Sequence, residues 1–167
     1  MAIYYGDGSN SNSGRIVKFH KGAFTTTTTS TSTNYDIFNV DITPQAAGNW
    51  FHITGRVAAS HTVSQSFYIQ FLIDNQYVGG RTGNSSDSSV SRSLFFESHA
   101  SNHRSYASYN TYEGAYTHIQ SSASAFNFKL RTRLQGGTQY LNYAASYDDI
   151  SRGKPICYYH IIEMEPS

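Results

Sequence analysis

The chain has 167 residues, enough for one domain with a sizeable core, and a formal net charge of +1. Hydrophobic residues make up 38% and charged residues 14%, but 14 Tyr and 10 Phe exclude a disordered chain, which would be poor in aromatic residues. The even charge balance offers no basic stripe to nucleic acid, no apolar run is long enough to cross a bilayer, and a single cysteine excludes an internal disulfide.

The first third of the chain predicts three strands. Residues 6–14 are all turn formers and predict an irregular entry loop. Alternation over 15–24 predicts the first strand, and the nine Ser and Thr residues of 25–33 predict an exposed edge strand or a long loop, because they contain no apolar position. Further apolar positions predict strands over 35–42 and 50–57, separated by a turn of small residues.

The clearest strand in the chain spans 66–73, because its apolar residues recur at period two. One face of this strand should meet the core and carries Phe67, Ile69, Phe71 and Ile73. The other face is also partly apolar, so we expect another subunit or a packed edge to cover Tyr68, Gln70 and Leu72. The Asp74-Asn75 pair predicts a tight turn into a return strand over 76–79.

The second half of the chain predicts shorter strands between turn-forming segments. After a strand at 93–98, residues 99–112 mix Tyr, Ser, Asn and His, and we expect this stretch to interrupt the strands as a long insertion. Four more strand candidates follow, at 116–120, 125–134, 139–145 and 156–163. Gly136-Gly137 predicts a hairpin between the second and third of these.

These elements define the expected fold. Eight to ten short strands without helical periodicity predict an all-β protein, an antiparallel two-sheet sandwich, with the jelly roll the best match in strand number. We expect one jelly-roll domain over 15–167 and an N-terminal attachment segment over 1–14. Within that segment Gly, Ser and Asn can adapt to an irregular surface, and the apolar anchor is Ile3, Tyr4 and Tyr5.

The sequence contains no pattern typical of an enzyme or a metal site. There is no Gly-x-Ser-x-Gly motif, and Asp148 and Asp149 are neighbours that would point to opposite faces of a strand. Glu97, His99 and His103 lack a recognised metal spacing, and Cys157 lies in an apolar strand typical of a buried thiol. We therefore expect no enzymatic activity, no metal and no cofactor.

One polar and aromatic stretch, within 98–116, has the composition of a recognition surface. Tyr combined with His, Asn and Arg supplies rigid aromatic area together with hydrogen-bonding groups, which is how proteins hold sugars. The candidate receptor or glycan contacts are His99, Asn102, His103, Arg104, Tyr106, Tyr109 and Tyr112. The alternative is that these tyrosines line a sheet face or a subunit interface, where Tyr is also enriched.

Three segments carry a resemblance to a known group of proteins. They are the opening Ile3–Ser9 with Ser13–Val17, the run Asp41-Ile42-Thr43-Pro44 followed by Trp50–Ile53, and the closing Tyr158–Met164. Together they make the chain similar to the short jelly-roll virion proteins of tailed bacteriophages, especially those of marine cyanobacteria. The resemblance does not extend to residues 80–125.

This resemblance implies a complement C1q or tumour-necrosis-factor type of jelly roll, assembled as a homotrimer on the virion. The expected function is that of a non-enzymatic capsid-decoration, knob or short-fibre protein that binds a capsid or tail protein through its N-terminal segment. The alternative is a lectin-like tail-fibre tip that recognises host surface glycans. Synthesis in the host cytoplasm and release by lysis fit the single free cysteine and an N-terminus without a secretory signal pattern.

Overall fold

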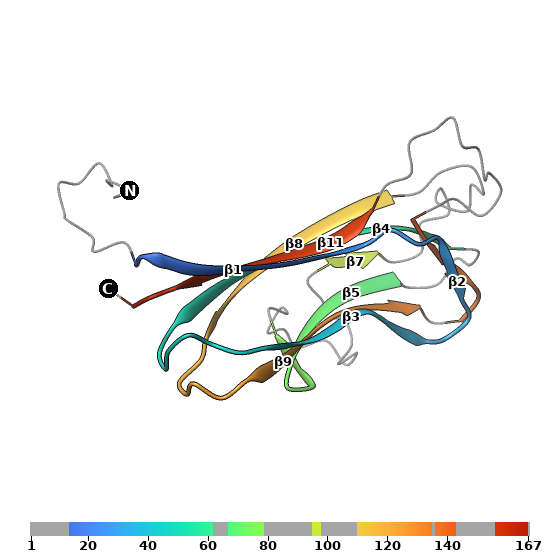
Figure 1. The fold of residues 1–167 in the computed structure, drawn as a ribbon. Coiled ribbons are helices and arrows are strands. Elements are labelled where there is room, and N and C mark those ends of the chain that lie inside the picture. Colours follow the sequence, from blue (N-terminus) through green and yellow to red (C-terminus); the bar gives the residue numbers. More distant parts are fainter. Residues whose placement is uncertain are drawn as a thin grey trace.

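The computed structural model describes residues 14–61, 67–78, 95–97, 110–134, 136–142 and 156–166, and every regular element among them is a β-strand (Figure 1). The strands are β1 (Ile16–Phe24), β2 (Thr28–Ser30), β3 (Asn34–Ile42), β4 (Trp50–His61), β5 (Phe67–Ile73), β6 (Gln76–Val78), β7 (Phe95–Glu97), β8 (Asn110–Ile119), β9 (Phe126–Leu134), β10 (Gln139–Leu141) and β11 (Cys157–Met164). All the pairings between them are antiparallel.

The first sheet is built around β4, its longest strand. One edge of β4 pairs with β11 along residues 50–56 and with β10 along 59–61, and the other edge pairs with β8. β1 pairs with the outer edge of β11, and the short β2 pairs with β10. The four long strands therefore follow the order β1-β11-β4-β8.

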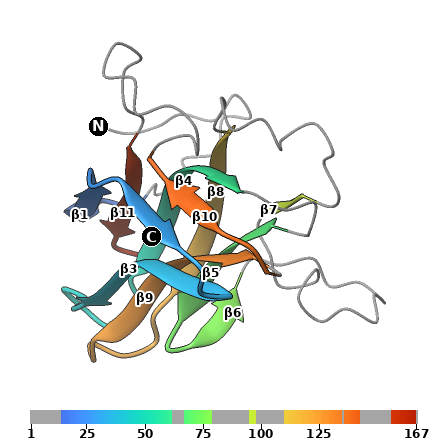
Figure 2. The same ribbon diagram turned by 90° about the vertical axis from the view of Figure 1, so that its right-hand side faces the viewer.

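The second sheet has the order β3-β9-β5, and β6 and β7 pair with different halves of the remaining edge of β5. The two sheets lie face to face (Figures 1 and 2). Successive long strands β3, β4, β5, β8, β9 and β11 alternate between the second and the first sheet, which is the strand order of a jelly roll. The predicted all-β two-sheet sandwich is thus confirmed.

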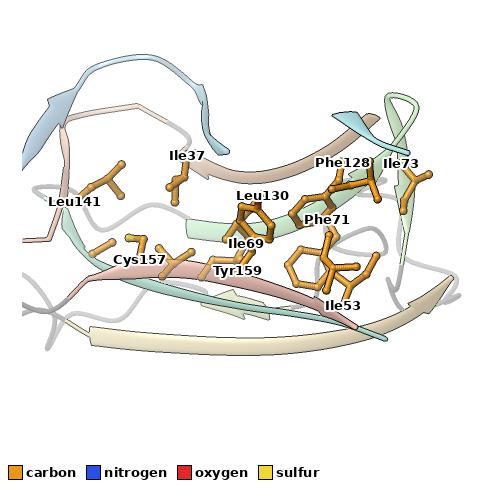
Figure 3. Close-up of a cluster of buried hydrophobic side chains, with 14 of the residues drawn as sticks. Ile37, Ile53, Ile69, Phe71, Ile73, Phe128, Leu130, Leu141, Cys157 and Tyr159 are labelled. Carbon is orange, nitrogen blue, oxygen red and sulfur yellow. The ribbon is translucent and has the colours of Figure 1, made fainter. Parts of the chain in front are cut away.

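The core fills the space between the sheets with side chains that alternate along each strand. In β9 and β11 every second residue is buried, as the period-two geometry of a half-exposed strand requires. Figure 3 shows Ile53 and Tyr159 from the first sheet meeting Phe71, Phe128 and Leu130 from the second. The rings of Phe71 and Phe128 pack edge to face, 5.5 Å between centroids.

Strand β5 is buried along its whole length, on both faces. Its core face carries the four predicted residues Phe67, Ile69, Phe71 and Ile73. On the opposite face Tyr68, Gln70 and Leu72 are buried within the single chain, and the Arg133 guanidinium lies 5.7 Å from the centre of the Tyr68 ring. A partner subunit is therefore not needed to cover this face.

The two tight turns predicted from sequence have different outcomes. Asp74 and Asn75 have φ values of 49° and 63°, as a two-residue hairpin requires, and they connect β5 to β6 as expected. Gly136 and Gly137 also turn with positive φ, but the predicted hairpin between the flanking strands is wrong. β9 belongs to the second sheet and β10 to the first, so the two glycines carry the chain across the sandwich.

Strand lengths differ from the sequence expectation at two places. β4 extends to His61, because 57–61 are buried and pair with β8 or β10. β8 begins at Asn110, whereas the sequence predicted a strand only from residue 116, so the expected insertion is shorter at its C-terminal end. The Ser and Thr tract contains β2, which among the described strands pairs only with β10 and forms an edge of the first sheet. Of the two forms predicted for this tract, an edge strand or a long loop, the structure has the edge strand.

Candidate functional site

Most of the candidate residues from the sequence lie outside the described part of the chain. This applies to the attachment residues Ile3, Tyr4 and Tyr5 and to the receptor candidates His99, Asn102, His103, Arg104, Tyr106 and Tyr109. The backbone of Tyr112 belongs to β8, where it pairs with Val57 of β4. Further along β8, Tyr116 packs against the hydrophobic core, so this tyrosine contributes to packing and does not belong to a contact surface.

The surface feature that stands out among the described residues is the outer side of β1, β11, β4 and β8, here called the four-strand face. The registers align its residues in four rows, each with one residue from every strand. In strand order the rows are Ile16, Met164, Trp50 and Ile119; then Phe19, Ile162, His52 and Thr117; then Lys21, His160, Thr54 and Ala115; and finally Ala23, Tyr158, Arg56 and Glu113.

The first two rows of this face carry four large apolar side chains that are open to solvent. Ile16, Phe19, Trp50 and Ile119 are 63%, 51%, 45% and 56% exposed. They are four of the five large hydrophobic side chains that are exposed in the described part of the chain. Large exposed apolar groups gathered in one place mark a surface that contacts another molecule.

A continuous series of ring and charge contacts runs from the second row of this face to the fourth. The Phe19 ring lies 5.4 Å from that of His160, and the His160 and Tyr158 rings stack at 4.8 Å. The Arg56 guanidinium lies 5.9 Å from the centre of the Tyr158 ring, and its Nε lies 3.7 Å from a Glu113 carboxylate oxygen. The series thus runs from β1 to β8 through all four strands.

A hollow of about 450 Å³ lies at this end of the four-strand face. Tyr158 and His160 of β11, Thr54 of β4, and Glu113 and Ala115 of β8 line it. Gly55 and Gly114, which pair directly across β4 and β8, line it as well. Because residues 114 and 115 carry almost no side chain, the sheet is low here between taller aromatic and charged neighbours.

The outer face of the second sheet is different, since its charges are paired with one another. Arg131 donates two hydrogen bonds to the Asp36 carboxylate, at 2.5 and 3.1 Å, and Lys129 donates one to Asn75 at 2.7 Å. Asn127 Nδ2 donates to the side-chain oxygens of Asn39 and Asp41 at 2.8 and 2.9 Å. The charged groups of β3 and β9 thus satisfy one another, whereas the four-strand face has only three charged side chains in sixteen positions.

A buried carboxylate, Glu163, lies on the inner side of β11. Its Oε1 accepts hydrogen bonds from the Gln45 backbone N–H at 2.6 Å and from Asn49 Nδ2 at 2.7 Å, which holds down the connection between β3 and β4. Its Oε2 lies 3.5 Å from Nε2 of His20. Burial lowers the pKa of His20, and the nearby Glu163 carboxylate opposes this without overcoming it. The arrangement is structural, because Glu163 is fully buried.

The lone thiol is equally unsuited to chemistry. Cys157 is buried and its Sγ lies 3.1 Å from Oδ1 of Asn142. Burial raises its pKa to about 11, so the thiol is protonated at neutral pH and is not a nucleophile. In the described part of the chain no three His, Cys, Asp or Glu side chains are grouped so that they could hold a metal ion. Nor do the described ranges contain a helix long and apolar enough to cross a membrane.

No protein-family model matches the chain, and no curated protein matches it. Solved structures similar to it include T=1 particles derived from infectious bursal virus, with a TM-score of 0.42 and 11% identity, and infectious bursal disease virus Gx strain, with 0.36 and 13%. Both alignments cover 100% of this chain but only 45% and 47% of the other, so the chain spans about half their length.

Both neighbours come from a virus or virus-derived particles. A likeness with a TM-score below 0.5 does not establish a shared fold. The jelly-roll assignment of this chain therefore depends on the strand order described above. Neither neighbour names a bacteriophage or a complement-type trimer, so the resemblance to phage virion proteins stays an expectation.

The residues of the four-strand face were missed by the sequence analysis. Arg56, Glu113 and His160 are far apart in the chain, and only the pairing of β11 and β8 with opposite edges of β4 brings them together. Their alternation within each strand was visible. The register between the strands was not, because it depends on contacts between distant segments.

Proposed function

We propose that the protein is a non-enzymatic structural component of a virion surface and that it assembles as a homotrimer through the four-strand face. The observation that carries the proposal is the contrast between the two outer faces of the sandwich. On the outer face of the second sheet, charged side chains pair with one another. The four-strand face instead exposes four large apolar side chains to solvent, Ile16, Phe19, Trp50 and Ile119. An exposed apolar patch of this kind marks a surface that contacts another molecule.

A second copy of the chain is the partner that this composition favours. A face with four exposed large apolar side chains and few charges resembles the core of an obligate interface, which is apolar and depleted in charged residues. The homotrimer is also what the resemblance to phage jelly-roll virion proteins implies.

Light scattering on the full chain tests the assembly. We expect a mass three times the 18.6 kDa of one chain at micromolar concentration. A monomer at that concentration would contradict the proposal.

The proposed attachment to the particle uses the N-terminal segment, with Ile3, Tyr4 and Tyr5 as the apolar anchor to a capsid or tail protein. The test replaces these three residues by Ser in the full chain and follows incorporation by immunogold labelling of intact particles. We expect labelled wild-type particles and unlabelled variant particles, with the variant folded by circular dichroism. Equal labelling of both would show that attachment uses another surface.

Recognition of host glycans by the 98–116 segment is the alternative function, favoured by the composition of that segment. Its test replaces Tyr106, Tyr109 and Tyr112 by Ala. Reduced binding to host cells with normal incorporation would support a lectin, whereas normal binding would leave plain decoration of the particle.

A further inference from the structure

The four-strand face has two unlike edges. At the β1 edge Phe19 projects with half its surface exposed, and Lys21 follows two residues later on the same face, also exposed. Towards the β8 edge the sheet is lowered by the hollow beside Ala115, with the Glu113 carboxylate at its rim. A projecting ring with a cation therefore occupies one edge, and a depression with an anion lies towards the other.

A ring of three copies requires this kind of asymmetry. In a cyclic trimer each contact joins two different patches, one from each neighbour, whereas a twofold dimer joins a patch to itself. We propose, on the basis of the homotrimer proposed above, that the hollow receives Phe19 of the neighbouring copy and that Glu113 pairs with Lys21 of that copy. The ring then closes because every copy offers one projection and one hollow.

The dimensions of the hollow suit this occupant. A cavity of about 150 Å³ holds a benzene ring, so the open hollow of about 450 Å³ has room for a phenyl ring and part of the neighbouring strand. Its aromatic side is formed by the stacked rings of Tyr158 and His160, and aromatic rings pack favourably on one another.

The charges agree with the same placement. Lys21 makes no ion pair with any described residue, and Glu113 has a side chain that is 62% exposed and only a 3.7 Å contact to Arg56. Glu113 can therefore accept a second cation. Both pairs, Phe19 with Lys21 and Ala115 with Glu113, are two residues apart on a strand, a spacing of about 7 Å.

The two pairs also run in the same direction along the sheet. The step from Phe19 to Lys21 passes from the second row to the third, and the step from Ala115 to Glu113 from the third to the fourth. A rotation preserves this direction when its axis is inclined to the strands so that the second row of one copy lies level with the third row of its neighbour. Each pair of one copy can then meet the other pair of that neighbour.

The test uses one variant for each side of the contact. Phe19→Ser removes the projection, and Ala115→Trp fills the hollow; both residues are exposed, so folding should be retained, and circular dichroism checks it. Light scattering should show that each variant alone falls from three chains to one. Matched controls are Ile156→Ser, which removes an exposed apolar side chain just before β11 and outside the four rows, and Ala123→Trp at an exposed alanine between β8 and β9, and both should remain trimeric.

Mixing the two variants gives the decisive result. Phe19→Ser retains an intact hollow and Ala115→Trp retains an intact Phe19, so one contact can form and the mixture should give a 1:1 dimer that neither variant forms alone. A trimeric Phe19→Ser variant, or a mixture that stays monomeric, would overturn the inference while leaving the homotrimer in place. A monomeric wild-type protein would instead overturn the homotrimer itself. If that monomer bound host lipopolysaccharide and Ala115→Trp did not, the hollow would be a glycan site.

Discussion

Phe71 is the residue on which both sheets converge. Its side chain is fully buried, and it packs against Phe128 and against Gly55 of the facing sheet. A Cβ at residue 55 would lie 2.8 and 2.9 Å from two atoms of the Phe71 ring. The glycine in the middle of β4 therefore serves close packing between the sheets.

Replacing Phe71 by Ala should lower the free energy of unfolding by about 3–5 kcal/mol, because a buried ring is lost and a cavity remains. Urea unfolding followed by circular dichroism measures it. The same substitution should make Gly55→Ala better tolerated than it is in the wild type, since the clash is with the Phe71 ring. A loss below about 1 kcal/mol for Phe71→Ala would contradict the packing described here.

The pKa of Cys157 leads to a prediction about reactivity. With the thiol buried and its pKa raised to about 11, the native protein should react with a thiol reagent such as Ellman's reagent only extremely slowly at pH 8. The control is the same protein in denaturant, where one thiol per chain should react at once. Rapid reaction of the folded protein would show that the thiol is accessible.

His20 makes stability depend on pH. Burial lowers its pKa on folding from the usual 6.5, so the unfolded chain binds the proton more tightly than the native one. Stability from this residue is therefore complete above about pH 6.5 and declines as the pH falls through that value towards the lower native pKa.

His20→Gln should flatten the decline in unfolding free energy between pH 7 and pH 5, measured by urea titration at each pH. The groups that face His20 are Glu163 and Lys18, and both remain in the variant. Wild-type and variant curves that run parallel over this range would exclude His20 as the source.

At the scale of the elements, Asn142 connects three strands just after β10. Its side-chain nitrogen donates to the carbonyl oxygens of Phe24 and Thr26, at 2.6 and 3.0 Å, and its Oδ1 accepts from the Cys157 backbone N–H at 2.9 Å. It has a left-handed φ of 64° and is fully buried. One amide thus ties the end of β1 to the start of β11.

Asn142→Gly removes the side-chain hydrogen bonds, but glycine adopts the left-handed backbone without strain. Asn142→Ala removes the same hydrogen bonds and also strains the backbone at this positive φ. Because each buried group left unpaired costs about 1–3 kcal/mol, both variants should be clearly less stable in urea. Asn142→Ala should be lower by roughly a further 1 kcal/mol owing to backbone strain. Equal stability of the two variants would mean that the backbone conformation is not what selects Asn here.

The strands could be predicted from sequence where the signal is local. The period-two pattern of β5 and the Asp74-Asn75 turn depend on neighbours in the chain, and both were predicted correctly. The sheet to which β10 belongs could not be predicted in this way, because the partner of a strand is chosen among distant segments. The four-strand face was unpredictable for the same reason, since its rows exist only in the folded register.

At the scale of the whole molecule, the single tryptophan reports on assembly. Trp50 lies in the first row of the four-strand face beside Ile119 and is 45% exposed in the single chain. In the proposed trimer its emission should be blue-shifted and protected from iodide quenching, and Phe19→Ser should reverse both changes. Identical emission and quenching in the trimer and in the monomeric variant would show that the apolar rows lie outside the contact.

Strand β11 lies inside its sheet, between β1 and β4. During synthesis β1 and β4 emerge early, yet neither can complete its pairing until residues 157–164 have left the ribosome. Synthesis proceeds at about 5–20 residues per second, so both strands wait for several seconds with open edges. The four-strand face does not exist before that moment. Association between copies through this face is therefore delayed until residues 157–164 have been made.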